Sequence, residues 1–425
     1  MGNIIQKFLE ELSDALSTER KLTSCDREMQ IYTDIQKERL MKKGLVLDYD
    51  FTGRGLNPEG REQGWEARDE HYFAKMWSSS NLYKRILKKN GKVINKKKQN
   101  VSVWALVINY INGQNMEDEV YVCPNCGNPE KIKALTEGCP YCGTSFKMDE
   151  LYPKVTGYNL VYDPSKDKKE MIKFYIITSA IAAAAMLIGL PVIITGAAVL
   201  IGIVLAILKV ISSETAGQLM LGGISLAVQS ICAAPFVGLI FSSGILVAKL
   251  LIEGAKSAPL LATFSTHKMF EEELKKYGVD FMPQYFMGQT VAKVKSAIFS
   301  ENPEELPFYE GGQLPEEMKD IVDIFFRGAI EFKSVEVKDD VAYVNANIYT
   351  EVLSEKNGKA KENQRIFNIN MKKNLSKKNS LDFAISKFMC PSCGTSFNAY
   401  KHKKCPACDN AYKMEDADWV IESIS

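Results

Sequence analysis

Eight of the ten cysteines in this chain fall into two sets of the same design, each made of two Cys-x-x-Cys pairs. The first set is Cys123, Cys126, Cys139 and Cys142, and the second is Cys390, Cys393, Cys405 and Cys408. Eleven or twelve residues separate the two pairs of a set, a spacing that lets four thiolates converge on one tetrahedral ion. The sequence therefore predicts two structural Zn²⁺ sites in zinc ribbons. Because four protein ligands fill the tetrahedron, neither site leaves a position for a catalytic water.

Disulfide pairing is the alternative for these cysteines. Residues 1–40 contain no continuous apolar run of the kind found in a cleavable signal peptide, and thiolate zinc sites suit a reducing compartment. Cys232 lies in an apolar stretch and is predicted to pack there. A reactive thiol at Cys25 is the less favoured hypothesis. Nearby positive charges would favour its thiolate, but Asp26 and Glu28 offset them.

The cysteine sets bracket a long apolar tract. Residues 174–208 and 215–248 carry no charged side chain, whereas about 20 apolar residues suffice for a helix to cross a bilayer. Pro191 and Pro235 interrupt the two stretches, and proline kinks or ends a helix. The sequence predicts a transmembrane tract over 171–252, formed by two long kinked helices or up to four short ones.

An even number of spans places both flanks of the tract on one side of the membrane. The flanks are rich in lysine: Lys166, Lys168, Lys169 and Lys173 precede the tract, and Lys249 and Lys256 follow it. Positive flanks stay in the cytoplasm, so we expect a multi-pass protein of the cell membrane with both termini cytoplasmic. A buried helical core and a hairpin that inserts only conditionally are the alternatives.

A lysine-rich hairpin is predicted in the N-terminal part, between strands at 45–56 and 101–112. Asn90-Gly91 is a strong signal for a two-residue hairpin turn. The hairpin carries eight basic residues: Lys84, Arg85, Lys88, Lys89, Lys92, Lys96, Lys97 and Lys98. They form either a solvated ribbon or a contact for anionic lipid headgroups or RNA. The absence of aromatic residues in the hairpin favours lipid over RNA.

Two further patterns concern the fold. Residues 3–17 place apolar side chains on one helical face, predicted to pack on the domain's own core. Cys-Gly-Thr-Ser-Phe occurs at 142–146 and again at 393–397, which favours duplication of a ribbon docked on a sheet, with two unrelated ribbons as the alternative. A diverged second copy within 45–160 is also left open.

The C-terminal part is predicted as helices followed by an antiparallel sheet. Helices are expected at 268–277, around 287–298 and at 316–330, and strands at 331–338, 341–353 and 365–372, with a turn at Asp339-Asp340. The fold class is therefore α+β. The predicted division is 1–44 (helical), 45–160 (α+β with the first ribbon at 123–146), 171–252 (membrane), 262–389 (α+β) and 390–425 (second ribbon and tail).

This C-terminal pattern resembles a known family. It combines Phe-Met-Pro-Gln-Tyr-Phe at 281–286, a helix through 291–299, Pro-Glu-Glu-Leu at 303–306, a zinc ribbon, and Asp-Trp-Val-Ile-Glu-Ser-Ile at 418–424. It is similar to bacterial membrane proteins that join a Tim-forty-four-like domain to a C-terminal zinc ribbon. The resemblance implies a cone of helices against a curved antiparallel sheet, like nuclear transport factor two, acting as a non-catalytic scaffold or lipid-contacting domain.

No enzyme is expected. The three histidines, His71, His267 and His402, lie far apart in the sequence, and it contains no P-loop, dinucleotide fingerprint or hydrolase motif. We expect a non-enzymatic platform that binds lipid or protein at the cytoplasmic membrane face, with a second copy of the chain as a further candidate partner. A channel-type protein regulated by its zinc modules is the alternative. Nucleic-acid binding is a lesser alternative, since the net charge is only +1.

Overall fold

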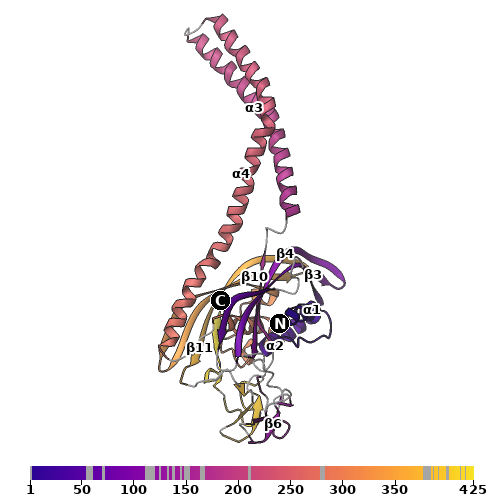
Figure 1. Ribbon diagram of the computed structural model, residues 1–425, viewed down its shortest axis with the longest axis vertical. Helices are drawn as coiled ribbons and strands as arrows, with labels where there is room; N and C mark the ends of the chain where they lie inside the picture. The colour runs from indigo at the N-terminus through magenta and orange to yellow at the C-terminus, as the bar shows by residue number, and fades with distance from the viewer. Residues whose placement is uncertain are drawn as a thin grey trace. The chain divides into compact units, whose positions relative to one another are not determined.

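The computed structural model consists of two compact units (Figure 1). Met1–Asp163 and Leu260–Ser425 together form one unit, here called the body, and Pro164–Pro259 form the other, here called the hairpin unit. The structure describes the whole chain except residues 1, 54–60, 69–71, 111–119, 124–125, 132–133, 136–138, 144–145, 148–153, 163–167, 209–211, 278–282, 377–383, 386, 391, 399–401, 412 and 417.

The N-terminal half of the body is two helices followed by an antiparallel sheet in the order β1-β3-β4-β8, with β2 paired to β3. The helices are α1 (Gly2–Ala15) and α2 (Arg27–Lys42), and the strands are β1 (Leu45–Gly53), β2 (Arg61–Arg68), β3 (Tyr72–Lys89), β4 (Lys92–Tyr110) and β8 (Lys154–Tyr162). The side chain of Asp26 caps α2 by accepting a hydrogen bond from the Met29 amide. The apolar face of α1 is buried in the core, as predicted.

The C-terminal half repeats this order with a second antiparallel sheet, β9-β10-β11-β15. Its helices are the end of α4 (Ser213–Lys275) and α5 (Pro283–Phe299), and its strands are β9 (Ile321–Lys338), β10 (Val341–Lys356), β11 (Lys359–Asn374) and β15 (Val420–Ile424). The expected turn at Asp339-Asp340 is present, with φ of 49° and 62°. The α+β class with antiparallel sheets is therefore confirmed.

The two halves share one topology. In each, three strands form a meander, β1-β3-β4 and β9-β10-β11, and the first half adds β2 beside β3. A four-cysteine ribbon follows, and a final strand returns beside the third strand of the meander. Lys-Asn-Gly-Lys forms the same turn at 89–92 and 356–359, with φ of 48° at Asn90 and 54° at Asn357. The glycine of each turn precedes the first ribbon cysteine by 32 positions, from 91 to 123 and from 358 to 390. The repeat thus extends beyond the ribbon to the whole module.

The two halves also share a single hydrophobic core, so the body is not two separate modules. Phe8 and Leu47 from the first half and Ile298 and Phe367 from the second belong to one cluster of buried side chains. Helix α5 crosses β8 where two glycines meet, and a Cβ on Gly288 would lie 2.3 Å from the Thr156 carbonyl oxygen. Only glycine allows this close approach of helix and strand.

One predicted element is wrong. Residues 316–330 do not form a helix: Glu316–Asp320 form a 3₁₀ turn, and β9 begins at Ile321. The run Ile-Val-Asp-Ile-Phe-Phe that starts there is rich in β-branched and aromatic residues, which favour a strand. Pro315 therefore does begin a helical segment, but this segment is only the short 3₁₀ element Glu316–Asp320.

The hairpin unit contains α3 (Lys168–Ile207) and the first part of α4. Pro191 lies inside α3 without ending it, so the described residues form two long helices rather than four short ones. The helices pack closely: a Cβ on Gly223 would lie 2.2 Å from the Ala198 Cβ. Within the described residues, one segment is long and apolar enough to cross a membrane: Tyr175–Ile207, with mean hydropathy 2.7 and 6% of its most apolar part buried.

Candidate metal centres

The structure brings each predicted set of four cysteines together. Within each set the four Sγ atoms lie within 4.8 Å of one another, an arrangement that could hold a metal ion. The closest pairs are Cys123–Cys142 at 3.7 Å and Cys126–Cys139 at 3.8 Å in the first set, and Cys390–Cys408 at 3.5 Å and Cys393–Cys405 at 3.6 Å in the second. Sulfurs bonded tetrahedrally at about 2.3 Å to one zinc would lie roughly 3.8 Å apart. A disulfide needs about 2.0 Å, so the spacing fits metal ligation.

All four Cys-x-x-Cys turns are built in the same way. The carbonyl of the first cysteine accepts a hydrogen bond from the amide four residues later, as between Cys123 and Gly127 at 2.8 Å and between Cys405 and Asp409 at 2.8 Å. The residue whose amide donates this hydrogen bond has a positive φ in every turn: Gly127, Gly143, Gly394 and Asp409. Glycine adopts this conformation without strain, which explains why three of the four pairs read Cys-Pro-x-Cys-Gly.

The thiols of the second set differ in acidity. The Asn410 amide acts to lower the pKa of the Cys408 thiol, but hydrogen bonds with Cys393 and Cys390 outweigh it and raise that pKa to about 12. Hydrogen bonds from the Thr395 side chain and amide lower the pKa of the Cys393 thiol to about 6. A thiolate rather than a thiol is the metal ligand, so this cysteine offers the ligand form at neutral pH.

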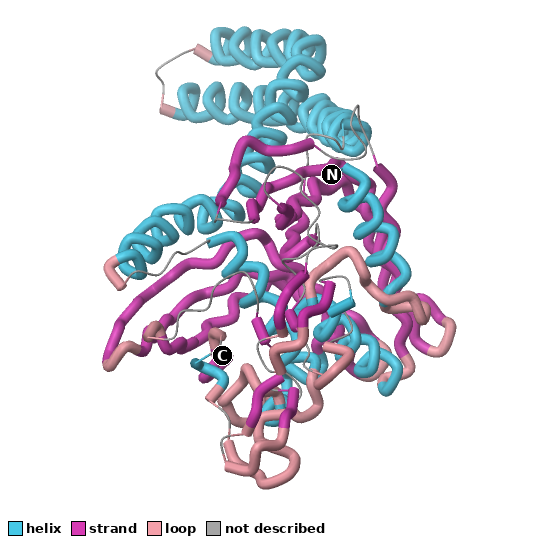
Figure 2. The backbone as a smooth tube through the Cα atoms, turned by 60° about the horizontal axis from the view of Figure 1, so that its bottom comes forward, coloured by secondary structure: helices cyan, strands magenta, loops and turns pink. Residues whose placement is uncertain are grey.

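The two ribbons are joined by their backbones. β7 (Phe146–Lys147), after the first ribbon, pairs antiparallel with β12 (Ala384–Ile385), before the second. The remaining short pairs are β5 (Val120–Val122) with β6 (Pro129–Lys131), and β13 (Lys387–Met389) with β14 (Ser396–Asn398). Both ribbons lie at one end of the body, the end where Figure 1 labels β6, and Figure 2 draws this end as loops with short strands. The two cysteine clusters therefore belong to one connected substructure.

Two lysines, the half-buried Lys403 and the buried Lys293, anchor the second ribbon and the tail to the body. Lys403, inside the ribbon, donates to the carbonyl oxygens of Glu304 at 2.9 Å and Tyr309 at 2.6 Å. Lys293 on α5 is 1% exposed; it pairs with Asp418 at 2.8 Å and donates to the Trp419 carbonyl at 3.0 Å. The Asp-Trp motif of the tail is thus fixed by a lysine that sequence reasoning did not single out.

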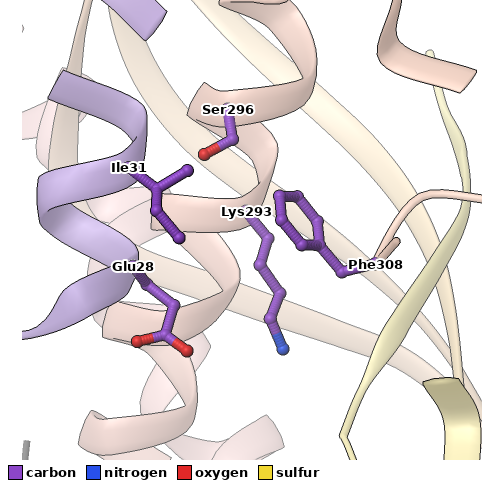
Figure 3. Close-up of a pocket in the computed structure, with 5 residues that line it drawn as sticks. All are labelled: Glu28, Ile31, Lys293, Ser296 and Phe308. Atoms are coloured by element: carbon purple, nitrogen blue, oxygen red, sulfur yellow. The ribbon is translucent and has the colours of Figure 1, made fainter. Parts of the chain in front are cut away.

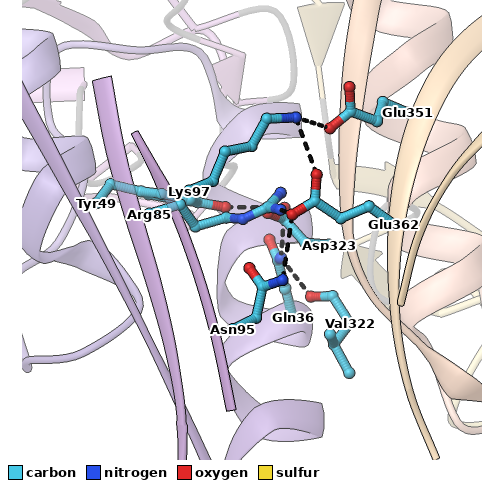
Figure 4. A network of polar contacts seen from close by, with 9 residues as sticks. All are labelled: Gln36, Tyr49, Arg85, Asn95, Lys97, Val322, Asp323, Glu351 and Glu362. Carbon is cyan, nitrogen blue, oxygen red and sulfur yellow. Dashed lines mark hydrogen bonds and ion pairs between the residues drawn. The ribbon is translucent and has the colours of Figure 1, made fainter. Parts of the chain in front are cut away.

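A buried ionic network joins the two sheets (Figure 4). Arg85, on β3, is fully buried and pairs with Asp323 on β9 at 3.5 Å and with Glu362 on β11 at 2.5 Å. Tyr49 donates to Asp323 at 2.8 Å. Burial raises the pKa of Asp323, although Arg85 opposes this. Burial acts in the same direction on Glu362, but Arg85 and Lys97 outweigh it and hold the pKa of that carboxyl at about 2.

The eight basic residues of the predicted lipid contact divide into two groups. Five of them pair with carboxylates of the body: Lys84 with Asp50, Lys88 with Asp48, Lys89 with Glu355, Arg85 with Asp323 and Glu362, and Lys97 with Glu351 and Glu362. The expectation is wrong for Arg85, because a residue with 0% exposure cannot reach a headgroup. Lys92, Lys96 and Lys98 are exposed and have no ion pair among the described residues.

Lys295 on α5 is a buried cation between aromatic rings. Its Nζ lies 4.6 Å from the ring centre of Tyr32 and 5.5 Å from that of Tyr158. Burial lowers its pKa to about 8, although Asp323 opposes the effect. The unfolded value is about 10.4, so between pH 8 and 10.4 the folded state binds fewer protons and stability rises with pH.

We therefore expect Lys295→Met to stabilise the protein at pH 7 by about 1–3 kcal/mol. The gain should be much smaller at pH 10.5, where the folded lysine is neutral and about half of the unfolded lysine has lost its proton. Thermal unfolding of the purified chain in detergent at the two pH values would measure this. Lys333→Met, at an exposed lysine (47%), is the control and should change little. A loss of stability at pH 7, or an equal gain at both pH values, would contradict the prediction.

None of the other candidate residues that the structure describes belongs to a cysteine cluster. His402 is exposed and joins neither cluster, whereas Nε2 of His267 lies 2.7 Å from the Ile330 carbonyl. Cys25 is fully buried in the core. His71 and the side chain of Cys232 lie outside the described residues.

The space between α2 and α5 is not a ligand pocket. Glu28 and Ile31 on α2, Lys293 and Ser296 on α5, and Phe308 line it (Figure 3). It has essentially no volume that a water molecule could enter. An open depression of about 610 Å³ does lie between the two Lys-Asn-Gly-Lys turns, lined by Lys89, Lys92, Ile94, Gly358, Lys359 and Ala360.

No family model, curated protein or solved structure matches this chain. The Tim-forty-four-like resemblance therefore stays a prediction.

Proposed function

We propose that this chain is a non-enzymatic membrane protein. Its hairpin unit anchors a zinc-stapled body, which serves as a binding platform at the cytoplasmic face of the cell membrane. The observation that carries the proposal is α3. Its segment Tyr175–Ile207 has mean hydropathy 2.7 with 6% of its most apolar part buried. Water disfavours so much exposed apolar surface, whereas a bilayer accommodates it.

We propose α4 as a second span, which would make the protein multi-pass. Its exposed apolar residues include Leu221, Ile224 and Val228, and the stretch 215–248 has no charge. Two antiparallel spans return the chain to its starting side, which is what a body assembled from residues before and after the hairpin requires. Zinc is the proposed metal, because four thiolates in tetrahedral spacing suit it.

The platform's proposed ligand is an anionic lipid headgroup, bound at the two Lys-Asn-Gly-Lys turns. Lys92 from the first half and Lys359 from the second line the same open depression, and Lys96 and Lys98 continue the positive surface along β4. Each lysine near an anionic membrane surface contributes about 1 kcal/mol. The hairpin unit is joined to the body at both ends, which keeps the body close to the membrane.

Membrane placement is tested by extracting membranes of cells that make the full chain with alkaline carbonate. We expect the protein to stay in the membrane pellet, and its release into the supernatant would refute the proposal.

Headgroup binding is tested by hydrogen exchange on the full chain in nanodiscs of neutral phosphatidylcholine, with or without phosphatidylserine. We expect slower exchange around Lys92 and Lys359 only with the anionic lipid, and loss of the effect in a triple variant, Lys92→Ser, Lys96→Ser and Lys359→Ser. The matched control, Lys333→Ser with Lys338→Ser, removes two exposed lysines elsewhere on the body and should keep the effect. Equal exchange in both nanodiscs would exclude this ligand.

A further inference from the structure

Helix α4 has two opposite faces between residues 216 and 229. Ala216, Met220 and Gly223 face α3: a Cβ on Gly202 would meet Met220 at 3.1 Å and the Ala216 carbonyl at 3.4 Å, and Gly223 abuts Ala198. Ala227 continues this row and is 5% exposed. The row pairs the two helices of a single chain.

A second row of residues lies two positions after each member of the row that faces α3. It consists of Gln218, Gly222, Ser225 and Gln229 and is here called the Gln229 face. Two residues turn a helix by about 200°, so this face points away from α3. All four residues are exposed, and neither amide has a hydrogen-bond partner among the described residues. The spacing of four, three and four repeats that of the row facing α3.

This face would be costly in a bilayer. Gln229 lies within three residues of the midpoint of the uncharged stretch 215–248, far from either interface. An amide without a hydrogen-bond partner is strongly disfavoured in hydrocarbon, because no water is present to replace the missing bond. Polar side chains in spans accordingly face other helices.

We propose that the Gln229 face pairs with the same face of a second copy of the chain inside the bilayer. A glutamine amide both donates and accepts hydrogen bonds, so an identical amide complements it across a two-fold axis. Gly222 and Ser225 lie between the two glutamines, and small residues at these positions let two helix backbones approach closely. The inference depends on the proposed function, because it needs α4 in the membrane.

The test is energy transfer between donor- and acceptor-labelled full-length chains in liposomes, over a range of protein-to-lipid ratios. The double variant Gln218→Met and Gln229→Met removes both amides at nearly constant size. We expect it to raise the dissociation constant of the dimer roughly tenfold or more. The control, Leu221→Met with Val228→Met, changes exposed residues outside this face and should leave the dissociation constant unchanged. Equal dimerisation of wild type and the Gln variant would overturn the inference.

Disulfide cross-linking tests the same face by position, in a Cys232→Ala background. Ser225→Cys should cross-link two copies, and Val228→Cys should not; the reverse pattern would overturn the proposal. If the chain resists carbonate extraction but is monomeric in liposomes, the further inference fails and the proposed function stands. If the chain is extracted by carbonate, both fail.

Discussion

Replacing Cys405 by serine is expected to halve the zinc content of the purified chain, from two ions to one. Cys405 is fully buried and belongs to the second cluster. A structural zinc contributes on the order of 10–16 kcal/mol of folding free energy in small domains, so losing a ligand should unfold this ribbon. Because β15 follows the ribbon and pairs with β11, we expect the tail to loosen as well. Metal analysis and counting of reactive thiols measure the first effect, and hydrogen exchange at residues 420–424 the second.

Cys25→Ser is the matched control for this experiment. Cys25 is as buried as Cys405 but lies outside both clusters, so both zinc ions should remain. If Cys405→Ser still holds two ions, the second site does not use this ligand, and the zinc hypothesis for the ribbon is wrong.

The connection between the ribbons adds a finer expectation for Cys139→Ser in the first cluster. Because β7 pairs with β12, disorder in the first ribbon should speed amide exchange at 384–385, next to the second ribbon. Unchanged exchange there would mean that the two centres are energetically independent.

Arg85→Met is expected to destabilise the body by about 3–5 kcal/mol, because removing one partner of a buried ion pair leaves the other charge uncompensated. Asp323 and Glu362 would both lose their contact with the guanidinium. Lys84→Met is the matched control on the same strand. The ion pair of Lys84 with Asp50 is partly exposed, at 33% and 48%, so its loss should cost less than about 1 kcal/mol.

The stability that Arg85→Met loses relative to the native chain should depend on pH in a defined direction. The folded pKa of Glu362, about 2, lies below its unfolded value of about 4.3. The stability from its ionised form is therefore present above pH 4.3 and is lost as the pH falls towards 2. We expect the gap between Arg85→Met and the native chain to be largest at neutral pH and to shrink below pH 4. Unfolding by guanidinium at pH 7 and pH 3 measures this gap. A gap that widens in acid would contradict the ion pair between Arg85 and the ionised Glu362 as its source.

A second substitution separates the charge effect from packing. In Arg85→Met with Glu362→Met, one of the uncompensated carboxylates is also removed. Part of the lost stability should return, as measured by a double-mutant cycle. No recovery would mean that Arg85 acts through packing against the Phe325 ring, which lies 4.9 Å from its guanidinium carbon.

The features that the sequence predicted correctly are local ones. The Cys-x-x-Cys pairs and the Asn90-Gly91 turn are set by residues a few positions apart, and the structure forms both. The mistaken helix at 316–330 shows the limit of local rules, because a buried apolar run suits a helix or a strand until its sheet partners are known. The shared core of the two halves depends on packing between distant segments, which no short pattern encodes.

Two features of the sequence could have predicted more of the structure: the repeat of the whole module and the burial of Arg85. Lys-Asn-Gly-Lys occurs twice at the same distance from a cysteine set, which marks the repeat of the whole module. Arg85 alternates with Tyr83 and Leu87, and all three are buried, as the two-residue period of a strand requires. Within a run of lysines, that alternation distinguishes an inward-facing cation from the solvated ones beside it.

The interrupted body has a consequence for the timing of biosynthesis. The Gln36 side chain donates to the Val322 carbonyl across 286 positions of sequence, so this contact must wait for the later residues. At roughly 5–20 residues per second, that delay is on the order of tens of seconds. Throughout it the first sheet, with Arg85 and its aromatic neighbours, lacks the second sheet that will cover it. The ribosome makes the whole hairpin unit during the same interval. The apolar surfaces of its helices must therefore be shielded from water before the two halves of the body can pack together.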